Sequence, residues 1–167
     1  HAVTKVNDIY FADFNEEKII GQIIPRDEVK TVSNKLISQT NRAGIFLTGE
    51  AGFGKSIILR KVLESLREQE IPLLSFRVDR LEPTQFPDEL GEQMGLPGSP
   101  TSVIAGISQE RQCVLIIDQL DAVSEASGRN PWFFDCIHQI IKQSQAYNNI
   151  RLLVACREFD LKNDSRL

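Results

Sequence analysis

A glycine-rich segment between an apolar run and an amphipathic stretch constrains the fold of this chain more than any other feature. Residues 49–56 read GEAGFGKS and fit the pattern G-x-x-x-x-G-K-[ST] in full. The apolar run Gly44 to Leu47 before it is typical of a strand, and the four-residue steps of Ile58, Val62 and Leu66 after it predict a helix. Glycines let the backbone turn so that successive N–H groups point at phosphate oxygens. We therefore expect a phosphate-binding loop between a strand and a helix.

Each residue type in this loop has a task in binding a nucleotide. Lys55 can reach the β- and γ-phosphates, the Ser56 hydroxyl can ligate Mg²⁺, and the helix that begins near Lys55 adds its positive dipole end. A turn that merely joins a strand to a helix is the alternative, but such a turn needs no lysine and serine after its last glycine. The predicted nucleotide contacts are Gly49, Glu50, Ala51, Gly52, Phe53, Gly54, Lys55, Ser56 and Ile57.

Strand-like and helix-like stretches alternate through the rest of the chain. Further strands are predicted at Leu73–Val78, Cys113–Ile117 and Ile150–Cys156, and helices at Asp27–Thr40, near Asp88–Met94, near Ser102–Gln109 and from Pro131 to about Asn148. This alternation implies an α/β fold with a parallel sheet that helices cover on both faces. Residues 1–24 show a mixed pattern and are predicted to form an irregular arm that packs against the core in residues 25–167.

Composition narrows the classes of function. The 167 residues are 41% hydrophobic and 25% charged, which suits one soluble domain. The 19 basic and 23 acidic residues are scattered, so nucleic-acid binding is not indicated. Cys113, Cys136 and Cys156 form no CxxC pair, which argues against a disulfide framework or a zinc site and favours the reducing cytoplasm. The longest apolar stretch, around Val114–Ile117, is far short of the roughly 20 residues of a membrane span.

Acidic residues follow one of the predicted strands. In VLIIDQLD, the apolar strand delivers Asp118 to its carboxyl end, where ligands bind in open α/β sheets. A carboxylate there can hold Mg²⁺ through a water while Ser56 takes another coordination position. Asp121, three residues on, can orient or deprotonate an attacking water. A helix cap or a turn residue is the alternative for such an aspartate, but the glycine loop upstream favours function for Asp118.

The strand-like run LLVACR ends in Arg157. An arginine at that strand end lies beside a γ-phosphate and stabilises charge there. Pairing at the surface with Glu158 or Asp160 is the alternative. We predict Asp118, Asp121 and Arg157 as catalytic residues, and Ser56 and Asp118 as metal ligands.

These motifs together resemble the P-loop ATPases of the STAND class, which are relatives of the AAA+ proteins and include NACHT and NB-ARC modules. The similarity spans about residues 23–160: GEAGFGKS looks like Walker A, VLIIDQLD like a Walker B with a second acid, LLVACR like the γ-phosphate-sensing motif, and IIPRDE like the element near the adenine. The resemblance implies ATP rather than GTP, with Mg²⁺, a P-loop three-layer sandwich with strand order 2-3-4-1, and Arg26 as a further nucleotide contact.

The resemblance also implies a further strand, a helical lid and a winged-helix domain, for which no room remains after Arg157. With His1 at the start, we expect the amino-terminal part of the ATPase core of a longer, cytoplasmic bacterial signalling or antiviral defence protein. The other domains of that chain would be its partners. Mg-ATP would switch it toward a homo-oligomer, and slow hydrolysis would reset it.

Two other functions stay open. Gln119 and Ala122 stand where related ATPases carry glutamate, which suits a non-hydrolysing nucleotide-binding scaffold. The inner Gly52 also suits a small-molecule P-loop kinase. The kinase is less favoured because a strand and two helices separate Lys55 from Asp118 and no arginine-rich lid segment is present.

Overall fold

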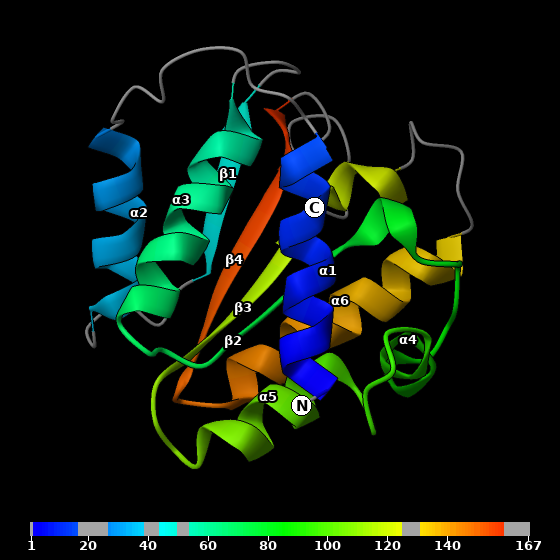
Figure 1. The fold of residues 1–167 in the computed structure, drawn as a ribbon. Helices are drawn as coiled ribbons and strands as arrows, with labels where there is room; N and C mark the ends of the chain where they lie inside the picture. Colours follow the sequence, from blue (N-terminus) through cyan, green and yellow to red (C-terminus); the bar gives the residue numbers. More distant parts are fainter. Residues whose placement is uncertain (1, 17–26, 39–43, 50–53, 125–130, 159–167) are drawn as a thin grey trace.

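Four parallel strands form the central sheet in the described part of the chain (Figure 1). The computed structural model describes residues 2–16, 27–38, 44–49, 54–124 and 131–158. Across the sheet the strands run in the order β1 (Ile45–Gly49), β4 (Ile150–Arg157), β3 (Cys113–Asp118) and β2 (Leu73–Arg77). Every neighbouring pair is parallel. Read from the other edge, this is the predicted order 2-3-4-1, which the structure confirms.

The central strands are apolar along their whole length because both of their faces are covered. All six residues of β3 are buried, and their side chains alternate between the two sides of the sheet. Val114 and Ile116 belong to one core cluster, whereas Leu115 and Ile117 belong to the other. A continuous apolar run of this kind is what a two-sided parallel sheet requires.

In the described ranges, two helices cover the first face of the sheet. These are α2 (Asp27–Ile37) and α3 (Lys55–Glu68), which pack against each other in Figure 1. From α3, the fully buried Leu59, Val62 and Leu63 enter the core at the spacing expected of one helix face. The helix thereby fixes the position of its own amino terminus at the end of β1.

Of the helices that the structure describes, three cover the second face. These are α4 (Pro87–Gln93), α5 (Pro100–Ser108) and α6 (Pro131–Ala146). Phe133, Ile137 and Ile140 of α6 are fully buried among the side chains of β3 and β4. Helices on both faces make a three-layer α/β sandwich of the P-loop NTPase type, as predicted.

The amino-terminal segment differs from the prediction. Residues 2–16 are not an irregular arm but the helix α1 (Ala2–Glu16), which runs along β2 (Figure 1). Val6 joins the core on the side of α4–α6, and Tyr10 joins the core on the side of α2 and α3. The helix therefore lies at the edge of the sheet and contacts both layers, and its buried face includes the polar Asn7, which weakens the apolar pattern by which a helix is normally predicted.

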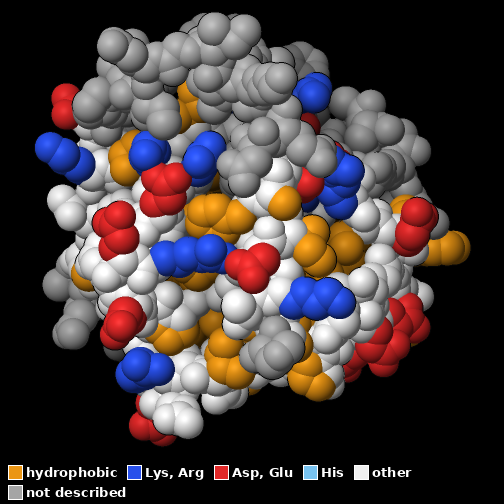
Figure 2. Space-filling model, viewed as in Figure 1, with side chains coloured by type: hydrophobic (Ala, Val, Ile, Leu, Met, Phe, Trp, Pro, Cys, Tyr) orange, Lys and Arg blue, Asp and Glu red, His pale blue; other side chains and the backbone are white. Residues whose placement is uncertain are grey.

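Short 3₁₀ turns follow two of the strands. The turn η1 (Val78–Arg80) continues from β2, and η2 (Leu120–Val123) comes one residue after β3. On the face viewed in Figure 1, lysine and arginine side chains are interspersed with aspartate and glutamate side chains (Figure 2). Of the residues that the structure describes, none belongs to a helix both long and apolar enough for a membrane span.

Candidate functional site

The carboxyl ends of the strands bring the predicted site residues to one edge of the sheet. Gly49, the last residue of β1, is the register partner of Arg157, the last residue of β4. Asp118, the last residue of β3, is the register partner of Arg77 in β2. Residues from four separate parts of the sequence thus lie along the same edge, which is where parallel α/β sheets bind ligands.

The glycine-rich loop leads into α3 through a left-handed residue. Gly54 has φ 82° and ψ 22° and caps the helix, and its carbonyl accepts hydrogen bonds from Ile57 N and Ile58 N at 3.1 Å each. A positive φ of this size favours glycine. Glu50, Ala51, Gly52 and Phe53, as well as Arg26, lie outside the described residues. Ser56 and Ile57 follow in the first turn of the helix, where amide N–H groups favour anions.

The Lys55 side chain folds back toward the strand that precedes the loop. Its Nζ donates to the carbonyl oxygen of Gly49 at 2.6 Å. The ammonium group is therefore held at the end of β1 by a residue at the start of α3. A cation at this place is suited to a polyphosphate that follows the loop backbone.

Asp118 is a buried carboxylate at the end of β3. Its side chain is 4% exposed. Burial raises the pKa of Asp118 to about 6, although hydrogen bonds from Tyr10 and Gln119 act in the opposite direction. Oδ2 accepts from the Tyr10 hydroxyl at 3.0 Å, and Oδ1 accepts from Gln119 N at 2.8 Å.

The chain turns sharply after Asp118. Gln119 has φ 59°, a left-handed conformation that is uncommon for a residue with a side chain. This turn starts η2 and brings Asp121, which is 8% exposed, close to the end of β4. There Arg157 Nε forms an ion pair with Asp121 Oδ2 at 3.2 Å. Two of the residues predicted to be catalytic are therefore paired with each other.

Tyr10 and Arg77 lie near the site but were not predicted from the sequence. Tyr10 contacts Asp118, although 108 positions separate them in the sequence. Arg77, at the end of β2, donates to both oxygens of Asp79 at 3.0 and 2.9 Å. The spacing of Val3, Val6 and Tyr10 in steps of three and four residues was the available signal for α1.

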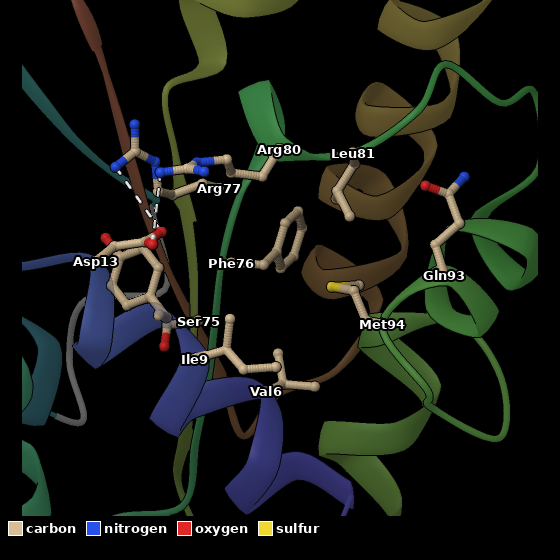
Figure 3. A pocket seen from close by; sticks show the side chains of 11 residues that line it. Val6, Ile9, Asp13, Ser75, Phe76, Arg77, Arg80, Leu81, Gln93 and Met94 are labelled. Atoms are coloured by element: carbon tan, nitrogen blue, oxygen red, sulfur yellow. Dashed lines mark ion pairs between the residues drawn. The ribbon is translucent and has the colours of Figure 1, made fainter.

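A separate hollow of about 170 Å³ lies between α1, β2 and α4 (Figure 3). Its walls include the apolar side chains Val6, Ile9, Phe76, Leu81 and Met94. Asp13, Arg77 and Arg80 lie at one end of it, joined by the ion pairs drawn in Figure 3. None of the described residues predicted to contact a nucleotide lines this hollow.

Comparisons with known proteins address the family and the fold. A family model described as an AAA domain matches residues 38–162. The structure of AMPPCP-bound DnaA from Aquifex aeolicus is similar with a TM-score of 0.52 at 14% sequence identity, over 84% of this chain and 42% of that one. The Pif1 helicase from Candida albicans has a TM-score of 0.44 at 22% identity, over 83% of this chain and 33% of the helicase. No curated protein sequence matches the chain.

The similarity to DnaA shows the fold. It covers most of the present chain, which spans less than half the length of that protein. The family match covers the loop, the strand ends that carry Asp118 and Arg157, and the helices between them. Helix α1, with Tyr10, lies before the matched residues.

Proposed function

This chain belongs to the family of AAA domains, and from that premise we propose that it binds Mg-ATP as the nucleotide-binding module of a larger, STAND-type signalling or defence protein. The observation that carries the proposal is the arrangement at one sheet edge of Lys55, bonded to the end of β1, with Asp118 and Arg157 at strand ends. The second acid at Asp121 and the arginine at the end of β4 support the STAND type in particular.

The residues present fit a magnesium nucleotide. The left-handed Gly54 allows the turn that a phosphate-binding loop needs, and Lys55 supplies the cation. Ser56 and Asp118 supply a hydroxyl and a carboxylate, which are hard oxygen donors of the kind that Mg²⁺ prefers. When bound, Mg²⁺ neutralises charge on the phosphate oxygens and polarises them.

Lys55 and the first turn of α3 would bind the phosphates, and Ser56 with Asp118 would hold the metal. In the structure Arg157 forms an ion pair with Asp121, so the guanidinium occupies one oxygen of that carboxylate. A γ-phosphate near the end of β4 offers the guanidinium a competing acceptor. Asp121 would then be able to orient a water and take its proton, which links hydrolysis to the presence of the third phosphate. In such a module, nucleotide exchange would switch a homo-oligomer of the longer cytoplasmic protein.

The test is calorimetry of Mg-ATP binding to the full-length protein. Lys55→Ala should raise the dissociation constant about 100-fold, because charge-assisted hydrogen bonds to phosphate are lost. Lys61→Ala is the matched control: Lys61 lies on the same helix, pairs with Glu64 at 2.7 Å, and should leave the affinity unchanged. Equal affinity of Lys55→Ala and the unmodified protein would refute the proposal.

A non-hydrolysing scaffold is the second candidate. It is favoured by Gln119, whose carboxamide cannot accept a proton at the position after Asp118, and by the engagement of Asp121 with Arg157. Phosphate release from ATP separates the two. Steady release that Asp121→Asn abolishes would reject the scaffold, and binding without release would reject the ATPase.

A further inference from the structure

Among the residues that the structure describes, one donor holds each oxygen of the Asp118 carboxylate. The backbone N–H of Gln119 occupies Oδ1, and the hydroxyl of Tyr10 occupies Oδ2. Both side chains are almost fully buried, with Tyr10 3% exposed and Asp118 4% exposed. The first donor belongs to the same turn as Asp118. The second comes from α1, at the other end of the described chain.

One turn before Tyr10, the side chain of Asn7 attaches α1 to the sheet. Its Nδ2 donates to the carbonyl oxygen of Leu73 at 2.8 Å, and its Oδ1 accepts from the N–H of Ser75 at 2.9 Å. These two backbone groups belong to β2, the edge strand of the sheet. The Asn7 carboxamide thus bonds to backbone groups of β2 that would otherwise pair with a neighbouring strand. These bonds fix the position of α1 along β2.

One turn after Tyr10, ion pairs hold the helix again. Asp13 Oδ2 lies 3.9 Å from Arg77 Nη1, and Asp13 Oδ1 lies 3.6 Å from Arg80 Nη2. Figure 3 shows both ion pairs at the end of the hollow beside α1. Because α1 is attached on either side of Tyr10, the hydroxyl has little freedom to move away from Asp118. The contact is a defined feature of the fold.

The hydroxyl is not needed for packing. The ring of Tyr10 lies in the core on the side of α2 and α3, where phenylalanine would fill nearly the same volume. What the hydroxyl adds is the hydrogen bond to Asp118. Accepting one hydrogen bond from Tyr10 leaves Oδ2 with a second lone pair, so the carboxylate keeps the capacity to hold another partner.

We propose that Tyr10 is a positioning residue, which orients the Asp118 carboxylate for the metal-nucleotide complex and makes α1 a working part of the site. The inference rests on the proposed function, because it assumes that Asp118 holds the metal. Helix α1 precedes residues 38–162, so the family match assigns it no role.

The test measures how much Mg²⁺ strengthens binding of a non-hydrolysable ATP analogue to the full-length protein. The readout is the ratio of the dissociation constants without and with Mg²⁺. Tyr10→Phe should lower this ratio about tenfold, which is the usual effect of removing a hydrogen bond to a charged group. Affinity in the absence of Mg²⁺ should stay unchanged. Asp118→Asn should remove most of the Mg²⁺ effect, and in that background Tyr10→Phe should have no further effect.

A matched control is Tyr147→Phe, which removes a hydroxyl from a tyrosine that is 42% exposed at the end of α6. It should leave the ratio unchanged. A Tyr10→Phe ratio equal to that of the unmodified protein would overturn the inference. The inference would also be overturned if Tyr10→Phe weakened analogue binding equally with and without Mg²⁺, or if it lowered the Mg²⁺ ratio by the same factor in the Asp118→Asn background. Either result would show that Tyr10 contributes packing alone. If the unmodified protein shows no Mg²⁺ effect and Lys55→Ala binds normally, the proposed function fails and this inference falls with it.

A second measurement does not depend on a Tyr10 variant. With 3-fluorotyrosine incorporated, the ¹⁹F resonance of Tyr10 should shift when Mg²⁺ is added to the analogue complex, and the shift should be absent in Asp118→Asn. The resonance of Tyr147 is the internal reference. A Tyr10 resonance that does not respond to Mg²⁺ in the unmodified protein would contradict the positioning role.

Discussion

Asp118 is buried with its charge only partly balanced. Its two hydrogen bonds favour the charged form, but loss of water outweighs them, and the pKa rises from 3.8 to about 6. Between these two values the folded protein binds more protons than the unfolded chain. The stability of the unmodified protein therefore falls as pH rises through this window, and the full cost of burying the charge is present above pH 6.

Asp118→Asn should consequently relieve that cost at high pH. The advantage of the variant over the unmodified protein is expected to be about 2–3 kcal/mol larger at pH 8 than at pH 4, and urea unfolding at the two pH values measures it. Asp135→Asn, at an exposed position of α6, is the control and should change stability by less than about 0.5 kcal/mol at either pH. If the stability of Asp118→Asn relative to the unmodified protein fell as pH rose, the hydrogen bonds to the Asp118 carboxylate would outweigh the cost of its burial.

The sequence predicted that Asp118 and Arg157 lie at strand ends and that Lys55 and Asp121 lie shortly after strands, because each is at, or a few residues beyond, the end of an apolar run. The carboxyl end of a parallel strand has a known place in the sheet, so local spacing was sufficient. The Asp121–Arg157 pair and the contact with Tyr10 depend instead on segments that are distant in the sequence. No local pattern specifies which side chain will meet Asp118 across the fold.

At the scale of elements, helix prediction succeeded where the buried face is apolar throughout and failed where a buried polar residue interrupts it. In α3, Ile58, Val62 and Leu66 face a single core, and their four-residue spacing predicted the helix. In α1, Val6 and Tyr10 enter different cores, and the buried residue between them is the polar Asn7. A helix at a sheet edge is stabilised by contacts that hydrophobic periodicity does not describe.

Helix α4 and the segment after it approach each other too closely for any side chain at Gly91. A Cβ there would lie 1.9 Å from the carbonyl oxygen of Gly98, which belongs to the backbone and cannot rotate away. Gly91→Ala should therefore destabilise the protein by about 2–3 kcal/mol, seen as a lower urea midpoint at unchanged slope.

Gly106→Ala is the matched substitution on the neighbouring helix α5. Nothing lies within 4 Å of a Cβ at that position, so the variant should be neutral or more stable by up to about 1 kcal/mol, since alanine favours a helix. Midpoints of the two variants that move in the same direction would contradict the close contact between α4 and Gly98.

At the scale of the whole molecule, the three layers leave the carboxyl edge of the sheet as the place where distant parts of the chain meet. Segments near both ends of the described chain reach it: Tyr10 from α1, and Arg157 from β4. The site therefore depends on the packing of both core clusters, one on each face of the sheet. A probe of the cluster beneath α4–α6 tests whether the layers unfold together.

The three cysteines provide that probe. Cys113 in β3, Cys136 in α6 and Cys156 in β4 are 0%, 0% and 1% exposed and share the core beneath α4–α6. Burial raises the pKa of Cys113 and raises that of Cys136 to about 12, so the reactive thiolate is suppressed in addition to being covered. Alkylation at pH 8, followed by mass spectrometry of the peptides, should label all three at one common rate, about 1,000-fold below the rate in urea. Rapid labelling of one cysteine, with the circular dichroism unchanged, would instead show that its helix or strand opens independently of the other layers.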